Sequence, residues 1–115
     1  MDDGSLQTRQ RGSTPIACVL TALSEPQRRR RAALAVALQV GTCDVVERPS
    51  GYAFHLDPGS VVAQRVEELI ALEKLCCPFL TFATGVDAAS GRVVLEVSGG
   101  EGVKAFLAAR FGLGG

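Results

Sequence analysis

Histidine and aromatic side chains are scarce in this sequence, which has one histidine, one tyrosine and no tryptophan among 115 residues. A catalytic or metal site built from several histidines is therefore excluded within one chain. An excess of either charge is also lacking, since 12 basic residues balance 12 acidic ones. Proteins that bind nucleic acid through charge have a basic excess, so we expect no nucleic-acid partner. The chain has no apolar run of about 18 residues or more, so we expect no transmembrane helix and no membrane partner.

The sequence does contain a core-forming composition and four cysteines. Apolar residues make up 47% of the chain, which excludes disorder as the main state, and 115 residues are enough for one domain. We predict a single domain over 15–111, between a flexible polar tail at 1–14 and a flexible glycine-rich end at 112–115. The tail lacks the apolar segment of a signal peptide, so we expect a cytoplasmic protein with reduced thiols.

Hydrophobic patterns and turn residues predict an α+β fold with the order β-α-β-β-α-β-β-α. The expected strands cover 16–23, 43–48, 51–57, 79–86 and 92–98, and the expected helices cover about 24–39, 61–76 and 101–111. The first six elements match the split β-α-β, or ferredoxin-like, pattern, with helices on one face of an antiparallel sheet of about five strands. The last strands have apolar residues on both faces. The face of the sheet that the helices do not cover could therefore be covered in a homodimer or by a further helix.

A carboxylate lies in the middle of the apolar face predicted for the second helix. The centre of this face on a helical wheel is close to Glu73. Its apolar members are Val62, Val66, Leu69, Ile70 and Cys77. An unpaired buried carboxylate is costly, so Glu73 should be paired, bound to a metal or protonated, unless the helix is rotated and the carboxylate is solvated.

Two cysteines follow this carboxylate at the end of the same helix. Cys76 and Cys77 stand at the i+3 and i+4 positions from Glu73, a spacing that brings side chains together on a helix. The unit E-x-x-C-C-P-F therefore gathers one carboxylate and two thiols where the helix ends. The alternative is that both cysteines are small hydrophobic residues of the core.

A third cysteine is expected at the same edge of the sheet. Cys18 lies on the predicted first strand and would be level with Glu73 and Cys77, provided that its side chain faces the helices. We predict Cys18, Cys76 and Cys77 as metal ligands, and we interpret Cys43 as structural. Three thiols without histidine suit a soft ion better than a four-coordinate structural zinc site. The candidate ions are mercury, copper(I), arsenite and zinc.

Four consecutive arginines start the first helix. Arg28 and Arg31 fall off its apolar face, whereas Arg30 points toward that face. We therefore predict that Arg30 pairs with Glu73 or binds an anionic group of a cofactor. The alternative is a solvated arginine whose stem covers apolar surface.

Four segments together resemble a group of small bacterial proteins that carry a C-C-P-F motif and have no settled activity. These segments are E-x-x-C-C-P-F-L-x-F, P-I-A-C-x-L, G-Y-x-F-x-L and E-G-V-K-x-F-L, and the resemblance covers about residues 15–111. Similar segments occur beside, or fused to, regulators of the mercury-responsive type in heavy-metal resistance. The resemblance implies a role for Glu73, Cys76, Cys77 and Cys18. Residues 83–90 depart from the more acidic version found in that group, which concerns a hairpin and not the thiols.

Three functional hypotheses follow. The first is the binding of a soft heavy-metal or metalloid ion by the cysteines, with Glu73 as base or further ligand, in metal resistance or sensing. The second is a thiol-dependent enzyme in which Glu73 activates Cys76 or Cys77 as a nucleophile or redox thiol. The third is an interaction module with structural cysteines. We rank ion binding first, so the expected partner is a metal ion or a small thiol-reactive ligand.

Overall fold

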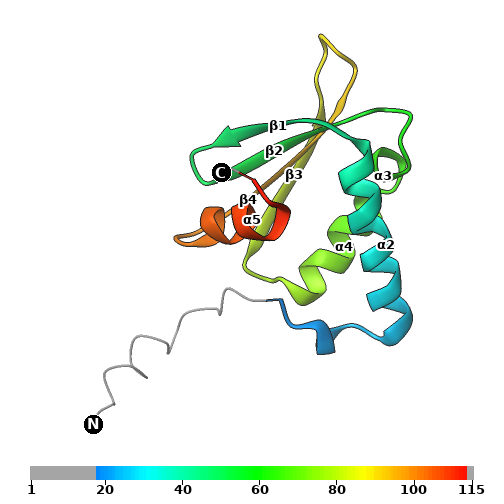
Figure 1. The fold of residues 1–115 in the computed structure, drawn as a ribbon, viewed down its shortest axis with the longest axis vertical. Coiled ribbons are helices and arrows are strands. Elements are labelled where there is room, and N and C mark those ends of the chain that lie inside the picture. The colour runs from blue at the N-terminus through cyan, green and yellow to red at the C-terminus, as the bar shows by residue number, and fades with distance from the viewer. Residues whose placement is uncertain (1–17, 114–115) are drawn as a thin grey trace.

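A four-stranded antiparallel sheet is the framework of residues 18–113, the part of the chain that the computed structural model describes (Figure 1). The strands are β1 (Thr42–Arg48), β2 (Gly51–Leu56), β3 (Leu80–Val86) and β4 (Val93–Gly99). Their order in the sheet is β1-β2-β4-β3, and each neighbouring pair is antiparallel. The predicted α+β class is confirmed.

Two of the five helices that the structure describes begin at a serine cap. The five are η1 (Leu20–Ala22), α2 (Glu25–Gly41), α3 (Val61–Gln64), α4 (Val66–Cys76) and α5 (Val103–Phe111). Ser24 caps α2 through a reciprocal capping box with Gln27, and the Ser60 side chain accepts a hydrogen bond from the first turn of α3. The helix predicted over 61–76 is divided at Arg65, whose N–H bonds to the carbonyls of both Val61 and Val62.

The core lies between the sheet and the helices. Alternate residues of β2 and β4 point to the same side, as successive side chains of a strand face opposite ways. These residues are Tyr52, Phe54, Leu56, Leu95 and Val97, and all are buried. They belong to one apolar cluster with side chains of α2, α4 and α5. Because α4 is held against this cluster, the residues of its last turn are held with it.

The strand predicted over 16–23 is wrong where the structure describes it. Cys18 and Val19 are irregular, and the next three residues form the short helix η1. The N–H of Val19 donates to the carbonyl of Cys76 at 2.7 Å, so this segment attaches to the end of α4 and not to a strand. Residues 16–17 lie outside the described range.

The ferredoxin-like order and the fifth strand are therefore not found within residues 18–113. In a split β-α-β sheet the first strand would lie between the strands at 51–57 and 79–86. Here β4 occupies that place, because it pairs with β2 on one side and with β3 on the other. The other predicted strands and helices are present, with bounds close to those expected. The predicted tail at 1–14 lies outside the described range.

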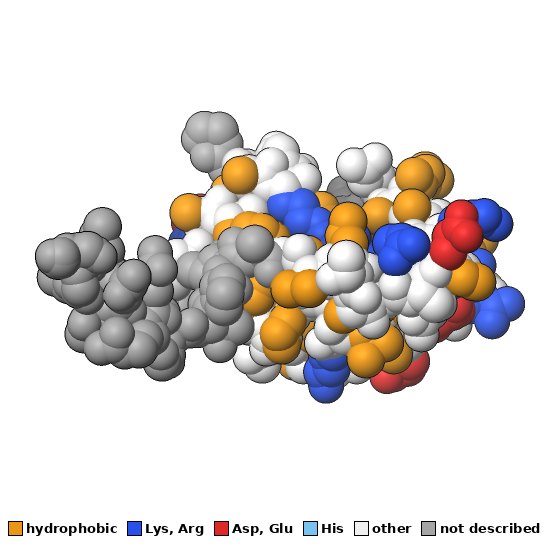
Figure 2. Space-filling model, turned by 90° about the horizontal axis from the view of Figure 1, so that it is seen from below, with side chains coloured by type: hydrophobic (Ala, Val, Ile, Leu, Met, Phe, Trp, Pro, Cys, Tyr) orange, Lys and Arg blue, Asp and Glu red, His pale blue; other side chains and the backbone are white. Residues whose placement is uncertain are grey.

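The exposed surface of residues 18–113 mixes hydrophobic and basic side chains. Val19, Leu20 and Leu75, at η1 and the last turn of α4, are about half exposed at 49%, 47% and 51%. Seen from below, hydrophobic side chains and Lys or Arg side chains are scattered over this surface, and a few acidic side chains lie toward the right of the view (Figure 2). No described helix is both long enough and apolar enough to cross a membrane.

Candidate functional site

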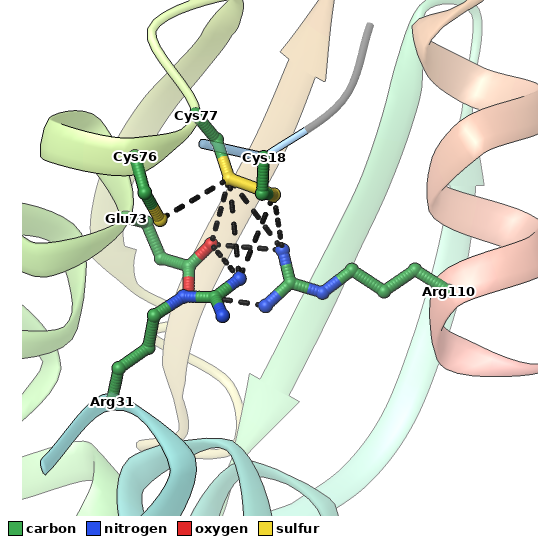
Figure 3. A network of polar contacts seen from close by, with 6 residues as sticks. All are labelled: Cys18, Arg31, Glu73, Cys76, Cys77 and Arg110. Atoms are coloured by element: carbon green, nitrogen blue, oxygen red, sulfur yellow. Dashed lines mark hydrogen bonds and ion pairs between the residues drawn. A yellow bond between two sulfur atoms is a disulfide. The ribbon is translucent and has the colours of Figure 1, made fainter. Parts of the chain in front are cut away.

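Three cysteines and one buried carboxylate meet at the end of α4 (Figure 3). The ligand atoms of Cys18, Glu73, Cys76 and Cys77 all lie within 4.8 Å of one another. Glu73 and Cys76 belong to the last turn of α4, Cys77 follows it, and Cys18 precedes η1. The proximity of these four residues, predicted from the sequence, is confirmed.

Backbone hydrogen bonds place the cysteines. Pro78 cannot continue α4 and pushes Cys77 out of the helical conformation, at φ −126° and ψ 69°. The N–H of Cys77 still donates to the carbonyl of Glu73 at 2.6 Å, so the backbone of Cys77 stays attached to the last turn of α4. The bond from Val19 to Cys76 described above then brings Cys18 to the same place.

Cys18 and Cys77 form a disulfide in this structure, with a Cα–Cα distance of 4.7 Å. This differs from the expectation that every thiol is reduced. It leaves two free cysteines, of which Cys43 is exposed and Cys76 is buried. The Sγ of Cys76 lies 3.6 Å from the Sγ of Cys77, so a third sulfur contacts the disulfide.

Two arginines pair with the buried carboxylate of Glu73. Arg31 donates through Nε to Oε2 of Glu73 at 2.7 Å, and through Nη2 to Oε1 at 3.4 Å. Arg110 donates through Nη1 to Oε1 at 3.0 Å and through Nη2 to Oε2 at 3.2 Å. Glu73 is only 5% exposed. Of the three states expected for a buried Glu73, the structure shows the paired one.

The prediction that Arg30 reaches Glu73 is wrong. Arg30 instead makes two hydrogen bonds to Glu68 in an ion pair at the surface, with Nε 2.5 Å from Oε2. Spacing alone allows either arginine to face the core, because Arg31 precedes the buried Leu34 by three residues and Arg30 precedes it by four. The position of α4 beside α2 decides that Arg31 turns inward to Glu73. Arg30 therefore lies outside the cluster.

Arg110 is a member of this site that sequence reasoning missed. It lies in the last turn of α5, 37 residues after Glu73, so no local spacing connects the two. A signal was present nonetheless. Arg110 follows the fully buried Leu107 by three residues, so a basic side chain falls on the apolar face of a short helix.

Both arginines also contact the disulfide sulfurs. The Sγ of Cys18 lies 3.6 Å from Nη2 of Arg31 and 3.5 Å from Nη1 of Arg110. The corresponding distances to the Sγ of Cys77 are 4.0 Å and 3.8 Å. The disulfide therefore lies against two positively charged groups as well as the carboxylate of Glu73.

The Cys77 sulfur lies beside the carboxylate of Glu73, and the Cys76 thiol is affected by burial. Oε1 of Glu73 lies 3.6 Å from the Sγ of Cys77, within reach of a thiol proton once the disulfide is reduced. Burial raises the pKa of the Cys76 thiol, and this effect exceeds the opposing influence of the Arg31 charge. The cluster therefore contains one neutral thiol beside a sulfur pair that faces two positive charges.

Comparison with known proteins finds no match for this sequence or structure. No family model matches the sequence, and no curated protein or solved structure is similar enough to count as a match. The resemblance to the C-C-P-F group stays a prediction. The function is therefore argued from the site itself.

Proposed function

We propose that the reduced protein captures a soft metal or metalloid ion through Cys18, Cys76 and Cys77, with Glu73 beside them. The observation that carries this proposal is the convergence of four ligand atoms within 4.8 Å. Thiolates are soft ligands and select thiophilic ions over ions that prefer oxygen. One ion in contact with all three sulfur atoms needs only small movements of the side chains.

Reduction of the disulfide is the first requirement of this function. With Cys18 and Cys77 joined, only the Cys76 thiol is free within the cluster. One thiol cannot hold an ion as two or three can. A cytoplasmic location fits the proposal, since thiols are kept reduced there. The role in metal resistance or sensing, and the homodimer, are likewise proposals.

Titration of the reduced protein tests ion capture. The full chain is reduced, desalted without oxygen, and titrated separately with arsenite, mercury(II), copper(I) and zinc, with uptake measured by elemental analysis. We expect stoichiometric uptake of at least one soft ion by the reduced form and little by the disulfide form. Cys43→Ser is the matched control, because Cys43 is exposed and outside the cluster. Equal uptake by a Cys76→Ser/Cys77→Ser variant would refute the proposal.

A thiol-dependent enzyme is the second candidate, and the disulfide favours it. The structure shows two cysteines joined beside a carboxylate and two guanidinium groups, an arrangement suited to a redox thiol. In this function Glu73 would take the proton of Cys77. The pH dependence of Cys77 alkylation in the reduced protein should then shift in Glu73→Gln. An unchanged profile would count against a role for Glu73 as base.

A further inference from the structure

Two arginines from different helices point at the same pair of sulfur atoms (Figure 3). Arg31 comes from α2 and Arg110 from α5, and each places a terminal nitrogen within 4.0 Å of both the Cys18 and Cys77 sulfurs. With Glu73, the fixed charges add to two positive and one negative, which leaves one net positive charge. While the sulfurs are uncharged this net charge attracts an anion, whereas ionised thiols would add negative charge and favour a cation.

Each guanidinium group keeps donors for a further ligand. Arg31 uses Nε and Nη2 for Glu73, and Arg110 uses Nη1 and Nη2. Within residues 18–113, Nη1 of Arg31 and Nε of Arg110 take part in none of the hydrogen bonds of the cluster. A guanidinium group presents five N–H donors in a planar fork that matches the oxygens of an oxyanion. The site thus combines anion recognition with sulfur nucleophiles.

We infer that the reduced site accepts a tetrahedral oxyanion of a soft element, with arsenate as the simplest example, and reduces it with Cys18 and Cys77. The inference rests on the proposed function in one respect, that these cysteines react with soft elements. It narrows the ligand from a metal or metalloid ion to an anion. It also adds a reaction, because the disulfide in the structure is the expected oxidised product.

The two sulfurs differ in their surroundings, and this difference assigns their roles. Cys18 is partly exposed, and its sulfur is the closer of the two to both guanidinium groups. Cys18 is therefore the nucleophile that meets the substrate. Cys77 is fully buried and lies 3.6 Å from Oε1 of Glu73, so it is the second thiol and Glu73 relays its proton.

The reaction balances in two steps. First, the Cys18 sulfur forms a bond to arsenic, and one arsenate oxygen leaves as water with the thiol proton and a proton of the substrate. Second, the Cys77 sulfur attacks the Cys18 sulfur and a disulfide forms. The electron pair of the sulfur–arsenic bond stays on arsenic, which leaves as arsenite with the Cys77 proton. Arsenic(V) is reduced to arsenic(III), and two thiols are oxidised.

A single-turnover experiment needs no added reductant. The full chain is reduced, desalted without oxygen and mixed with arsenate, and arsenite and free thiols are then measured after denaturation. We expect stoichiometric arsenite, a fall from four free thiols to two, and a Cys18–Cys77 disulfide in the peptide map. Cys43→Ser should behave like the native chain, whereas Cys18→Ser and Cys77→Ser should yield no arsenite.

Two further measurements separate anion recognition from simple thiol oxidation. Inorganic phosphate has the same shape as arsenate and is not reduced, so it should slow the reaction with arsenate and leave oxidation by the neutral reagent diamide unchanged. Arg31→Lys and Arg110→Lys should lower the arsenate rate by about tenfold and the diamide rate by much less, because lysine lacks the planar fork. Circular dichroism of the variants checks that they fold, and the phosphate test needs no variant.

The outcomes distinguish this inference from ion capture. The oxyanion inference would be overturned if all four thiols stayed free after mixing with arsenate. It would also be overturned if phosphate left the rate of arsenate reduction unchanged. Uptake of arsenite or mercury by the same reduced protein would then still support the proposed function. Arsenite formation without ion uptake would support the inference and refute the capture of an ion.

Discussion

Arg31 and Glu73, which are 42 positions apart in the sequence, form an ion pair with 2.7 Å between Nε and Oε2. The pair joins α2 to the last turn of α4 and lies beside the Cys18–Cys77 disulfide. The same ion pair therefore holds α2 against α4 and places a guanidinium group beside the sulfurs of the site.

Arg31→Ala should destabilise the fold, because it removes one partner of a buried carboxylate. Loss of a partner in a buried ion pair costs about 3–5 kcal/mol, and because Arg110 remains on Glu73 we expect a smaller loss, about 2–3 kcal/mol. Urea unfolding measures the change. Arg30→Ala is the matched control, because its pair with Glu68 is at the surface and should contribute little. Equal losses in the two variants would contradict the assignment of Arg31 to the interior.

Reduction of the disulfide should lower the free energy of unfolding. Cys18 and Cys77 are 59 residues apart, and the loss of loop-closure entropy in the unfolded chain corresponds to about 4 kcal/mol for such a loop. Thermal unfolding with and without a reductant measures this. Cys18→Ser should be insensitive to reductant, and Cys43→Ser should respond like the native chain. A native chain that melts equally in both conditions would show that the disulfide does not form in solution.

The two free thiols of the oxidised protein should react at different rates. Cys43 is exposed, whereas Cys76 is buried and its pKa is raised by burial, so the concentration of accessible thiolate is much lower at Cys76. Iodoacetamide followed by mass spectrometry should show rapid modification of Cys43 and slow modification of Cys76. Similar rates would mean that the end of α4 opens readily.

Alkaline pH should destabilise the oxidised protein through Cys76. Its folded-state pKa is raised by burial, so the stabilisation is fully present below the unfolded pKa of about 8.5. Above that pH the unfolded chain loses the proton first, and the free energy of unfolding falls until the pH passes the folded pKa. Urea unfolding between pH 7 and pH 10 measures the slope, and Cys76→Ala should show a smaller one. Parallel slopes in the two proteins would exclude this role for Cys76.

Gly51 should be intolerant of a side chain, because β2 and β4 approach each other closely there. A Cβ at this position would lie 1.9 Å from the carbonyl oxygen of Val97, which is backbone and cannot turn away. We expect Gly51→Ala to destabilise the fold by about 2 kcal/mol or more, as overpacking does. Gly85→Ala is the matched control in β3, since a Cβ there meets nothing within 4 Å. A stable Gly51→Ala protein would contradict the described strand pairing.

Local features of the site were readable in the sequence. The spacing of Glu73, Cys76 and Cys77 lies within one helical turn and its end, so the helix period predicts their proximity. The proline after Cys77 predicts where the helix stops. Cys18 joins them as predicted, although it does so from an irregular segment held by a backbone bond to Cys76, not from a strand.

Features that depend on packing between distant segments were not readable. A helical wheel separates Arg30 from Arg31 by only about 100°, and the position of α4 beside α2 decides which one turns inward. Arg110 approaches Glu73 from α5, and only the folded chain shows this. In the sheet, β4 lies between β2 and β3. The pattern of apolar residues in each strand predicts that a strand forms but does not predict which strands become its neighbours.

The backbone bond between Val19 and Cys76 has a consequence for folding. It holds Cys18 beside Cys77 once α4 has formed its last turn, so we expect the folded chain to form this disulfide faster than the unfolded chain. Formation of the disulfide across this separation of 59 residues should then follow the attachment of Val19 to the end of α4. Quenching the thiols at successive times during refolding would give the fraction of chains with the Cys18–Cys77 disulfide, and so the time at which these two segments come together.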